Sequence, residues 1–141
     1  MEDYYCHQCS VELGLLNPES ANFINFTGST YKLDKFIKHT LPPNQAGRIS
    51  VFSDPSYETY KNYTINAMAS GSTMLDQYQR LNIVWYAAKE NGITFQDSVP
   101  HTTTDVVKVV LPYNEDKIHS FPINSSELVT KICKRCGRNI I

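Results

Sequence analysis

The chain has four cysteines, and they form two pairs with the same spacing, Cys6-His7-Gln8-Cys9 and Cys133-Lys134-Arg135-Cys136. Two intervening residues allow both thiolates of a pair to reach one ion. Two such pairs complete the tetrahedral four-sulfur shell that zinc prefers in structural sites. Gly137 follows the second pair and suits the tight turn of a knuckle. The pattern therefore predicts one structural ion bound by Cys6, Cys9, Cys133 and Cys136.

Zinc is the metal that we expect at these cysteines. Iron in a rubredoxin-like site is the alternative, but rubredoxin knuckles are richer in Pro and Gly than His-Gln and Lys-Arg. Disulfides are disfavoured in the reducing compartment that we expect for this chain. A redox pair of the thioredoxin type needs a following helix, and only five residues follow Cys136. The sequence leaves open whether one chain or two supply the ligands.

The two pairs lie unusually far apart, because residues 10–132 separate them. Zinc ribbons commonly place their pairs about 15–20 residues apart. Closing the longer loop costs only roughly 2 kcal/mol more, whereas zinc binding in small sites supplies on the order of 10–16 kcal/mol. We therefore predict a zinc-ribbon-like site in which knuckles 4–11 and 131–138 close a single domain, residues 1–141, with a folded body at 17–130.

Helices are predicted for the middle of this body. A short helix is expected from Ser29 or Thr30 to about Thr40, and a short strand near 49–52. Asp54 and Pro55 suit a helix start; Tyr57, Tyr60, Thr64, Ala67 and Met68 form the apolar face of that helix, and Gly71 ends or kinks it. A second helix is expected over 72–91, with an apolar stripe made of Leu75, Tyr78, Leu81, Trp85 and Ala88.

Strands are predicted for the later part of the chain. Residues 106–111 are rich in valine, residues 112–116 have turn chemistry, and residues 118–123 are again apolar. This pattern indicates a β-hairpin, and residues 124–132 are expected to form one helical turn or a strand. The predicted fold class is α+β, with a helical middle and a β-hairpin between the two knuckles.

Composition limits the class of protein. Of 141 residues, 41% are hydrophobic and 19% charged, which is typical of a globular domain. The net charge of −1 argues against binding to nucleic acid by bulk charge. No apolar run approaches the roughly 20 residues that cross a bilayer, and no signal peptide is visible at the N-terminus. We therefore expect a cytoplasmic protein that is not held in a membrane.

Two surfaces are candidates for partner contact. The one dense basic cluster consists of Lys131, Lys134, Arg135 and Arg138, beside the predicted metal site. Several tyrosines of the predicted helices offer rings for base stacking beside basic residues, namely Tyr57, Tyr60, Tyr63 and Tyr78 with Lys61 and Arg80. For His7, inside the first knuckle, we expect an exposed side chain.

Two patterns point instead to a nuclease. Asp105 followed by Glu115-Asp116-Lys117 loosely matches an arrangement in which carboxylates hold Mg²⁺ and a lysine assists the attacking water. Separately, the segment His119-Ser120-Phe121-Pro122, then Leu128-Val129, then Cys133-x-x-Cys136 is similar to part of the four-cysteine HNH nucleases. That resemblance implies that His119 acts as a general base beside a metal-bound phosphate.

The chemistry with the strongest support in the sequence is structural metal binding. We therefore predict a small, non-catalytic, zinc-binding module that docks onto a protein or nucleic-acid partner. The alternative is a metal-dependent nuclease, a degenerate relative of the four-cysteine HNH enzymes. The two predictions differ in the number of metal ions, because a nuclease needs a catalytic ion outside the cysteine cage.

Overall fold

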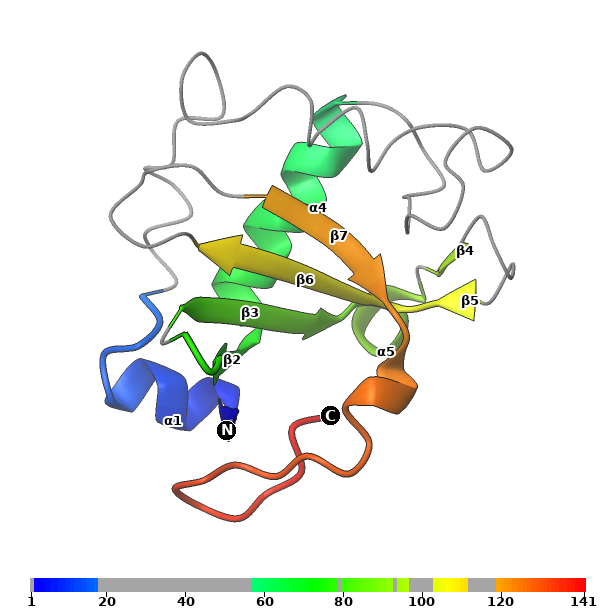
Figure 1. The fold of residues 1–141 in the computed structure, drawn as a ribbon. Coiled ribbons are helices and arrows are strands. Elements are labelled where there is room, and N and C mark those ends of the chain that lie inside the picture. Colours follow the sequence, from blue (N-terminus) through cyan, green and yellow to red (C-terminus); the bar gives the residue numbers. More distant parts are fainter. Residues whose placement is uncertain (1, 18–56, 79, 93, 97–102, 112–118) are drawn as a thin grey trace.

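The computed structural model describes residues 2–17, 57–78, 80–92, 94–96, 103–111 and 119–141. Its central element is a five-stranded antiparallel sheet with the order β1-β2-β3-β6-β7 (Figure 1). The strands of this sheet are β1 (Asp3–Tyr5), β2 (Ser72–Leu75), β3 (Leu81–Tyr86), β6 (Val106–Leu111) and β7 (His119–Ile123). A second, small sheet pairs β4 (Phe95–Gln96) with β5 (Thr103–Thr104).

Helices are few in the described part of the chain. They are α1 (His7–Glu12), α4 (Tyr57–Ser70), α5 (Ala87–Asn91) and the 3-10 helix η3 (Ser125–Glu127). None of these helices has the length and apolar character needed to cross a bilayer.

Helix α4 packs behind the sheet (Figure 1). Side chains alternate between the two faces of a strand, so Ile83 of β3 and Val107 and Val109 of β6 share the face toward α4, and none of the three is exposed. Thr64 of α4 hydrogen-bonds to Ser120 of β7 on the same side. This layer of helix on sheet buries apolar side chains of β3 and β6 against α4.

The opposite face of the sheet is only partly covered. One part of this face packs on the C-terminal segment, in a cluster of buried residues that includes Tyr4, Val84, Leu128 and Ile140. The face is hollowed beside that cluster, with two adjoining cavities of about 320 and 350 Å³, and Tyr4, Val84 and Leu128 of the cluster line the larger one. Lys108 of β6, the strand between β3 and β7, lines both cavities. Its ammonium lies 5.9 Å from the ring centre of Phe121 on the neighbouring strand.

Helix α4 confirms one prediction from the sequence. It ends at Ser70, and the next residue, Gly71, donates its N–H to the Ala67 carbonyl at 2.8 Å. A Cβ at Gly71 would lie 2.5 Å from that carbonyl oxygen and 2.5 Å from Ile83 Cγ2. Glycine is therefore required where the chain passes from α4 into the sheet. The predicted cap at Asp54 and Pro55, the helix near 29–40 and the strand near 49–52 lie outside the described residues.

The predicted helix over 72–91 is wrong. This segment forms β2, a turn, β3 and only then the five-residue helix α5. Apolar residues three to four positions apart predict one helical stripe in this segment. However, β-branched and aromatic residues dominate β3, and such residues favour a pleated strand. Trp85 is buried as expected, with 3% of its surface exposed, but it lies on a strand. The expected hairpin is confirmed, because β6 and β7 pair antiparallel.

Asp76 explains how the chain turns between β2 and β3. Its carboxylate accepts hydrogen bonds from the N–H groups of Tyr78 and Arg80, from Arg80 Nε and from Asn82 Nδ2. Such an Asp side chain replaces backbone partners in a turn. Burial on its own raises the pKa of Asp76. The hydrogen bonds to Arg80, Tyr78 and Asn82 outweigh it and lower the pKa to about 2.

Asp76→Asn should therefore lower the free energy of unfolding by roughly 1.5–3 kcal/mol at neutral pH, as expected for hydrogen bonds to a charged group. Because the folded-state pKa is depressed, this contribution is present above the ordinary aspartate pKa near 4 and is lost as the pH falls toward 2. Denaturant unfolding of both proteins across this pH range measures the difference in stability. Loss of a metal in acid would affect both proteins equally, so it cancels in this difference. A pH-independent difference, or an equal loss in the exposed control Gln77→Ala, would contradict this role.

Candidate metal centre

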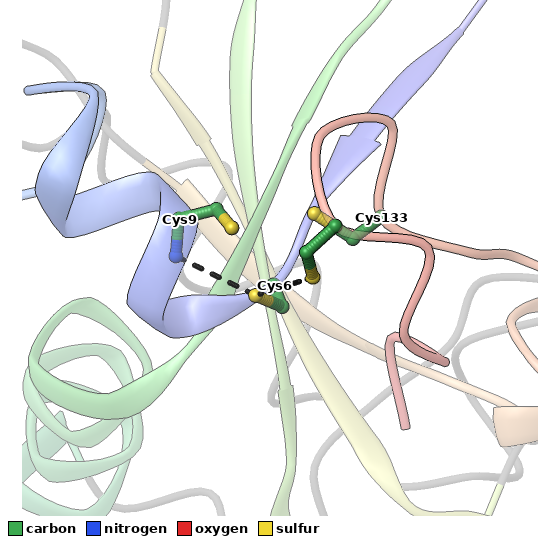
Figure 2. A group of neighbouring side chains, drawn as sticks. Cys6, Cys9 and Cys133 are labelled. Carbon is green, nitrogen blue, oxygen red and sulfur yellow. Dashed lines mark hydrogen bonds between the residues drawn. The ribbon is translucent and has the colours of Figure 1, made fainter.

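The four cysteine sulfurs converge on one point in the structure. Their Sγ atoms all lie within 4.8 Å of one another, although the two pairs come from opposite ends of the chain. Figure 2 shows the side chains of Cys6, Cys9 and Cys133 turned toward a common centre. Cys9 and Cys133 are buried, Cys6 is partly buried and Cys136 is exposed. None of the four forms a disulfide.

The N-terminal pair begins helix α1. Cys6 is the N-cap residue, and its sulfur accepts a hydrogen bond from the Cys9 N–H at 3.4 Å (Figure 2). One helical turn then returns Cys9 to the same side as Cys6. Strand β1 precedes this pair directly, so strand, cysteine pair and helix follow one another within ten residues. The sequence did not reveal that the first pair begins a helix.

Helix α1 is fixed to the sheet by two polar contacts. Ser10, with no exposed surface, hydrogen-bonds through Oγ to Thr73 Oγ1 of β2 at 2.7 Å. His7 is half-buried, and its Nδ1 donates to the Gly71 carbonyl at 2.9 Å. His7 is therefore not the exposed knuckle residue that we expected. Both residues hold the helix that carries Cys6 and Cys9, and a sequence pattern gives no signal for contacts over 60 residues apart.

The C-terminal pair lies in a hairpin-like knuckle. The Cys133 N–H donates to the Arg138 carbonyl at 2.7 Å, and the Gly137 N–H donates to the Cys133 carbonyl at 2.9 Å. Gly137 has a φ of 77°, a left-handed conformation that favours glycine. An isolated bridge between Ile132 and Asn139 closes the knuckle. The second pair thus has the geometry that its sequence predicted.

Contacts between the two ends hold the pairs together. The Lys134 N–H donates to the Tyr4 carbonyl at 2.7 Å, which attaches the knuckle to the edge of β1. Side chains add three further links at the surface. These are Lys134 to Asp3 at 3.2 Å, Arg135 to Glu12 at 2.7 Å and Arg138 to Gln8 at 3.2 Å. We call these three links the terminal clamp.

The terminal clamp changes the interpretation of the basic cluster. Lys134, Arg135 and Arg138 all reach across to the N-terminal segment. Lys131 differs from them, because its ammonium lies 5.6 Å from the Tyr4 ring centre, beside the hollow face of the sheet. The structure therefore divides the cluster into three clamp residues and one residue of the hollow. Partner binding by these residues stays a prediction.

The electrostatic setting of the sulfurs suits a bound cation. Burial raises the pKa of Cys133, but backbone N–H groups of Cys6, Cys136 and Arg135 outweigh it, and the net pKa is lowered. Burial raises the pKa of Cys9, and protons shared with the three neighbouring sulfurs raise it further, against a guanidinium contact from Arg135. The thiols thus share protons that a metal dication displaces when it binds.

The sulfur positions can be compared with a metal shell. A tetrahedral shell with Zn–S distances of about 2.3 Å has sulfurs about 3.8 Å apart. The Cys6 and Cys136 sulfurs are 3.8 Å apart, and no two of the four sulfurs are more than 4.8 Å apart. Sub-ångström to ångström shifts of side chains would complete the shell. The four cysteines therefore fit a metal ion without rearrangement of the backbone.

The residues of the two nuclease patterns are not assembled into a second centre in the described residues. The Asp105 carboxylate accepts from the N–H and the Oγ of Ser125, both at 2.7 Å, and so holds the start of η3. Its predicted partners Glu115, Asp116 and Lys117 lie outside the described residues. His119 is the first residue of β7. The cysteine group is the one cluster of three or more potential ligands found among the described residues.

Comparisons with known proteins leave the fold and this centre as the basis for inference. The chain matches no protein-family model, no curated protein and no solved structure.

Arg135 connects the clamp to the metal centre, since its guanidinium contacts both Glu12 and the Cys9 sulfur. Arg135→Gln should weaken zinc binding by roughly tenfold, as for other groups that position metal ligands. Competition with a chromogenic chelator measures this affinity. Arg138→Gln is the matched control, because Arg138 contacts Gln8 and no sulfur that the structure describes. Equal zinc affinities in the two variants would show that Arg135 does not support the site.

Proposed function

We propose that this chain is a small, non-catalytic, zinc-binding module in which one ion joins the two ends and stabilises a surface for docking onto a partner. The observation that carries the metal assignment is the convergence of four sulfurs within 4.8 Å, with one separation already at the 3.8 Å of a zinc–thiolate tetrahedron. Like a zinc ribbon, the proposed site has one ion shared by two Cys-x-x-Cys pairs. It differs in that the first pair lies at the start of helix α1 and not in a knuckle.

The metal site is continuous with the core, which supports a structural role. Cys9 and Cys133 belong to the same buried cluster as Tyr4, Val84 and Leu128. An ion at this point would hold both β1 and the C-terminal segment against the sheet. Structural zinc ions contribute directly to folding free energy in this way.

Purified protein should contain about one zinc per chain, and removal of a ligand should release it. Cys133→Ser leaves three thiolates, so we expect loss of the ion and a lower melting temperature, since metal-binding energy contributes to folding. Elemental analysis and thermal unfolding with and without a chelator measure both effects. Val129→Ser, an exposed position four residues away, is the matched control and should retain the metal.

The metal count also separates the proposal from its alternative. A metal-dependent nuclease would bind a second ion outside the cysteine cage, and chelation would abolish cleavage of nucleic acid. Iron in place of zinc, or a metal-free protein with unchanged stability after chelator treatment, would contradict the zinc assignment.

The docking part of the proposal is supported by the hollow face of the sheet. Lys108 and Lys131 line it, and each ammonium lies over an aromatic ring, Phe121 and Tyr4 respectively. Within the described part of the chain, neither ammonium forms an ion pair. Phe121 is partly exposed, whereas Tyr4 is buried, so Lys108 and Phe121 are the cation and ring that a base of single-stranded nucleic acid could contact. Glu2 and Glu127 also line this face, so attraction should be modest and strongly dependent on salt.

A binding assay can decide between the hollow face and the basic knuckle. We expect Lys108→Glu to weaken binding of a labelled single-stranded oligonucleotide more than Lys134→Glu/Arg138→Glu does, because the latter residues already contact the N-terminal segment. Fluorescence anisotropy at two salt concentrations measures the affinities. The reverse order would assign the surface to the knuckle. No binding by the wild type would exclude nucleic acid and leave a protein partner.

A further inference from the structure

One member of the cysteine cluster differs from the others in its access to solvent. Cys136 is exposed, whereas Cys9 and Cys133 have only 5% and 1% of their surface exposed. The sulfur of Cys136 lies 3.8 Å from that of Cys6, a residue from the other end of the chain. The exposed sulfur therefore has a neighbouring thiol with which it can form a cross-link between the two ends.

We propose that Cys136 is an oxidation site for small hydroperoxides, and that the product is a Cys6–Cys136 disulfide that replaces the metal as the link between the chain ends. The release of metal in this proposal rests on the zinc-binding function proposed above. The choice of sulfurs rests only on exposure and on the distance between them.

The reaction takes place in two balanced steps. The Cys136 thiolate attacks hydrogen peroxide, the O–O bond breaks, an S–O bond forms, and the departing hydroxide takes up a proton to become water. The Cys6 thiolate then attacks the sulfenic sulfur, the S–O bond breaks, and the second hydroxide also leaves as water. Two electrons pass from the sulfurs to the peroxide. With two of the four thiolates consumed, the ligand shell is incomplete and the ion is released.

The structure favours Cys6 over Cys133 as the attacking thiolate. Cys133 is buried, with 1% of its surface exposed, whereas Cys6 is only partly buried. The Cys6 sulfur already lies 3.8 Å from that of Cys136. Its hydrogen bond from the Cys9 N–H is long, at 3.4 Å. This sulfur needs to approach Cys136 by only about 2 Å to reach disulfide length.

The end-to-end contacts keep these two residues together after the ion leaves. Lys134 remains bound to Asp3 and to the Tyr4 carbonyl, and Arg135 remains bound to Glu12. None of these contacts involves a sulfur of the proposed disulfide. The disulfide can therefore form and be reduced again without separation of the chain ends, so oxidation should be reversible by a thiol reductant.

The test uses the zinc-loaded full chain, treated with hydrogen peroxide, alkylated and digested with trypsin. Trypsin cleaves after Lys134 and Arg135, so Cys133 and Cys136 fall in different peptides, whereas Cys6 and Cys9 share one. We expect the N-terminal peptide linked to Cys136-Gly137-Arg138, with fragmentation that places the bond at Cys6. A Cys133–Cys136 or Cys6–Cys9 disulfide, or Cys136 oxidised to sulfinic acid with no disulfide, would overturn the proposal.

Variants separate this proposal from the metal assignment. Cys9→Ser should still form the Cys6–Cys136 disulfide even though it loses the ion, and Cys6→Ser should form no disulfide to the N-terminal peptide. Zinc release should match the loss of two alkylatable thiols, and dithiothreitol should restore both thiols and zinc binding. If the protein holds zinc and keeps all four thiols in peroxide, the oxidation proposal fails alone. If it holds no zinc but forms this disulfide, the metal assignment fails alone.

Discussion

The meeting of four sulfur atoms at one point is the constraint on which the rest of the structure depends. To bring Cys6 and Cys9 to Cys133 and Cys136, strand β1 must lie at the edge of the sheet beside the C-terminal knuckle. The sheet provides this arrangement, because β1 pairs with β2 and accepts the Lys134 N–H through the Tyr4 carbonyl. Four sulfurs without a metal would gain little from this proximity. A bound ion would offset the cost of collecting them, and their positions are compatible with holding one.

The polar contacts around the cysteine cluster differ in how deeply they are buried. Ser10 and Thr73 form a fully buried hydrogen bond that fixes the orientation of α1 on the sheet. The clamp pairs lie at the surface, where water and salt screen them. The buried contacts around the cysteine cluster should therefore contribute more to stability than the surface pairs do. The surface pairs set the register in which the two chain ends meet.

The sequence predicts local chemistry well in this protein and predicts distant contacts poorly. The cysteine pairs, the end of α4 at Gly71 and the hairpin of β6 and β7 all have signals within a few residues. The β2–β3 hairpin was missed because its apolar spacing also fits a helix, and because Asp76 makes its turn through side-chain bonds that no motif records. The roles of His7 and Arg135 depend on partners from distant segments, so only the folded arrangement reveals them.

The backbone bond between Lys134 and Tyr4, together with the sulfur cluster, makes the described fold a closed loop from residue 9 to residue 133. This closure has a mechanical consequence. If an ion is bound, tension applied to the two chain ends would load the metal–thiolate bonds, the terminal clamp and β1 before it reached β3, β6 and β7. The cysteine cluster would then take up a pulling force before most of the sheet did.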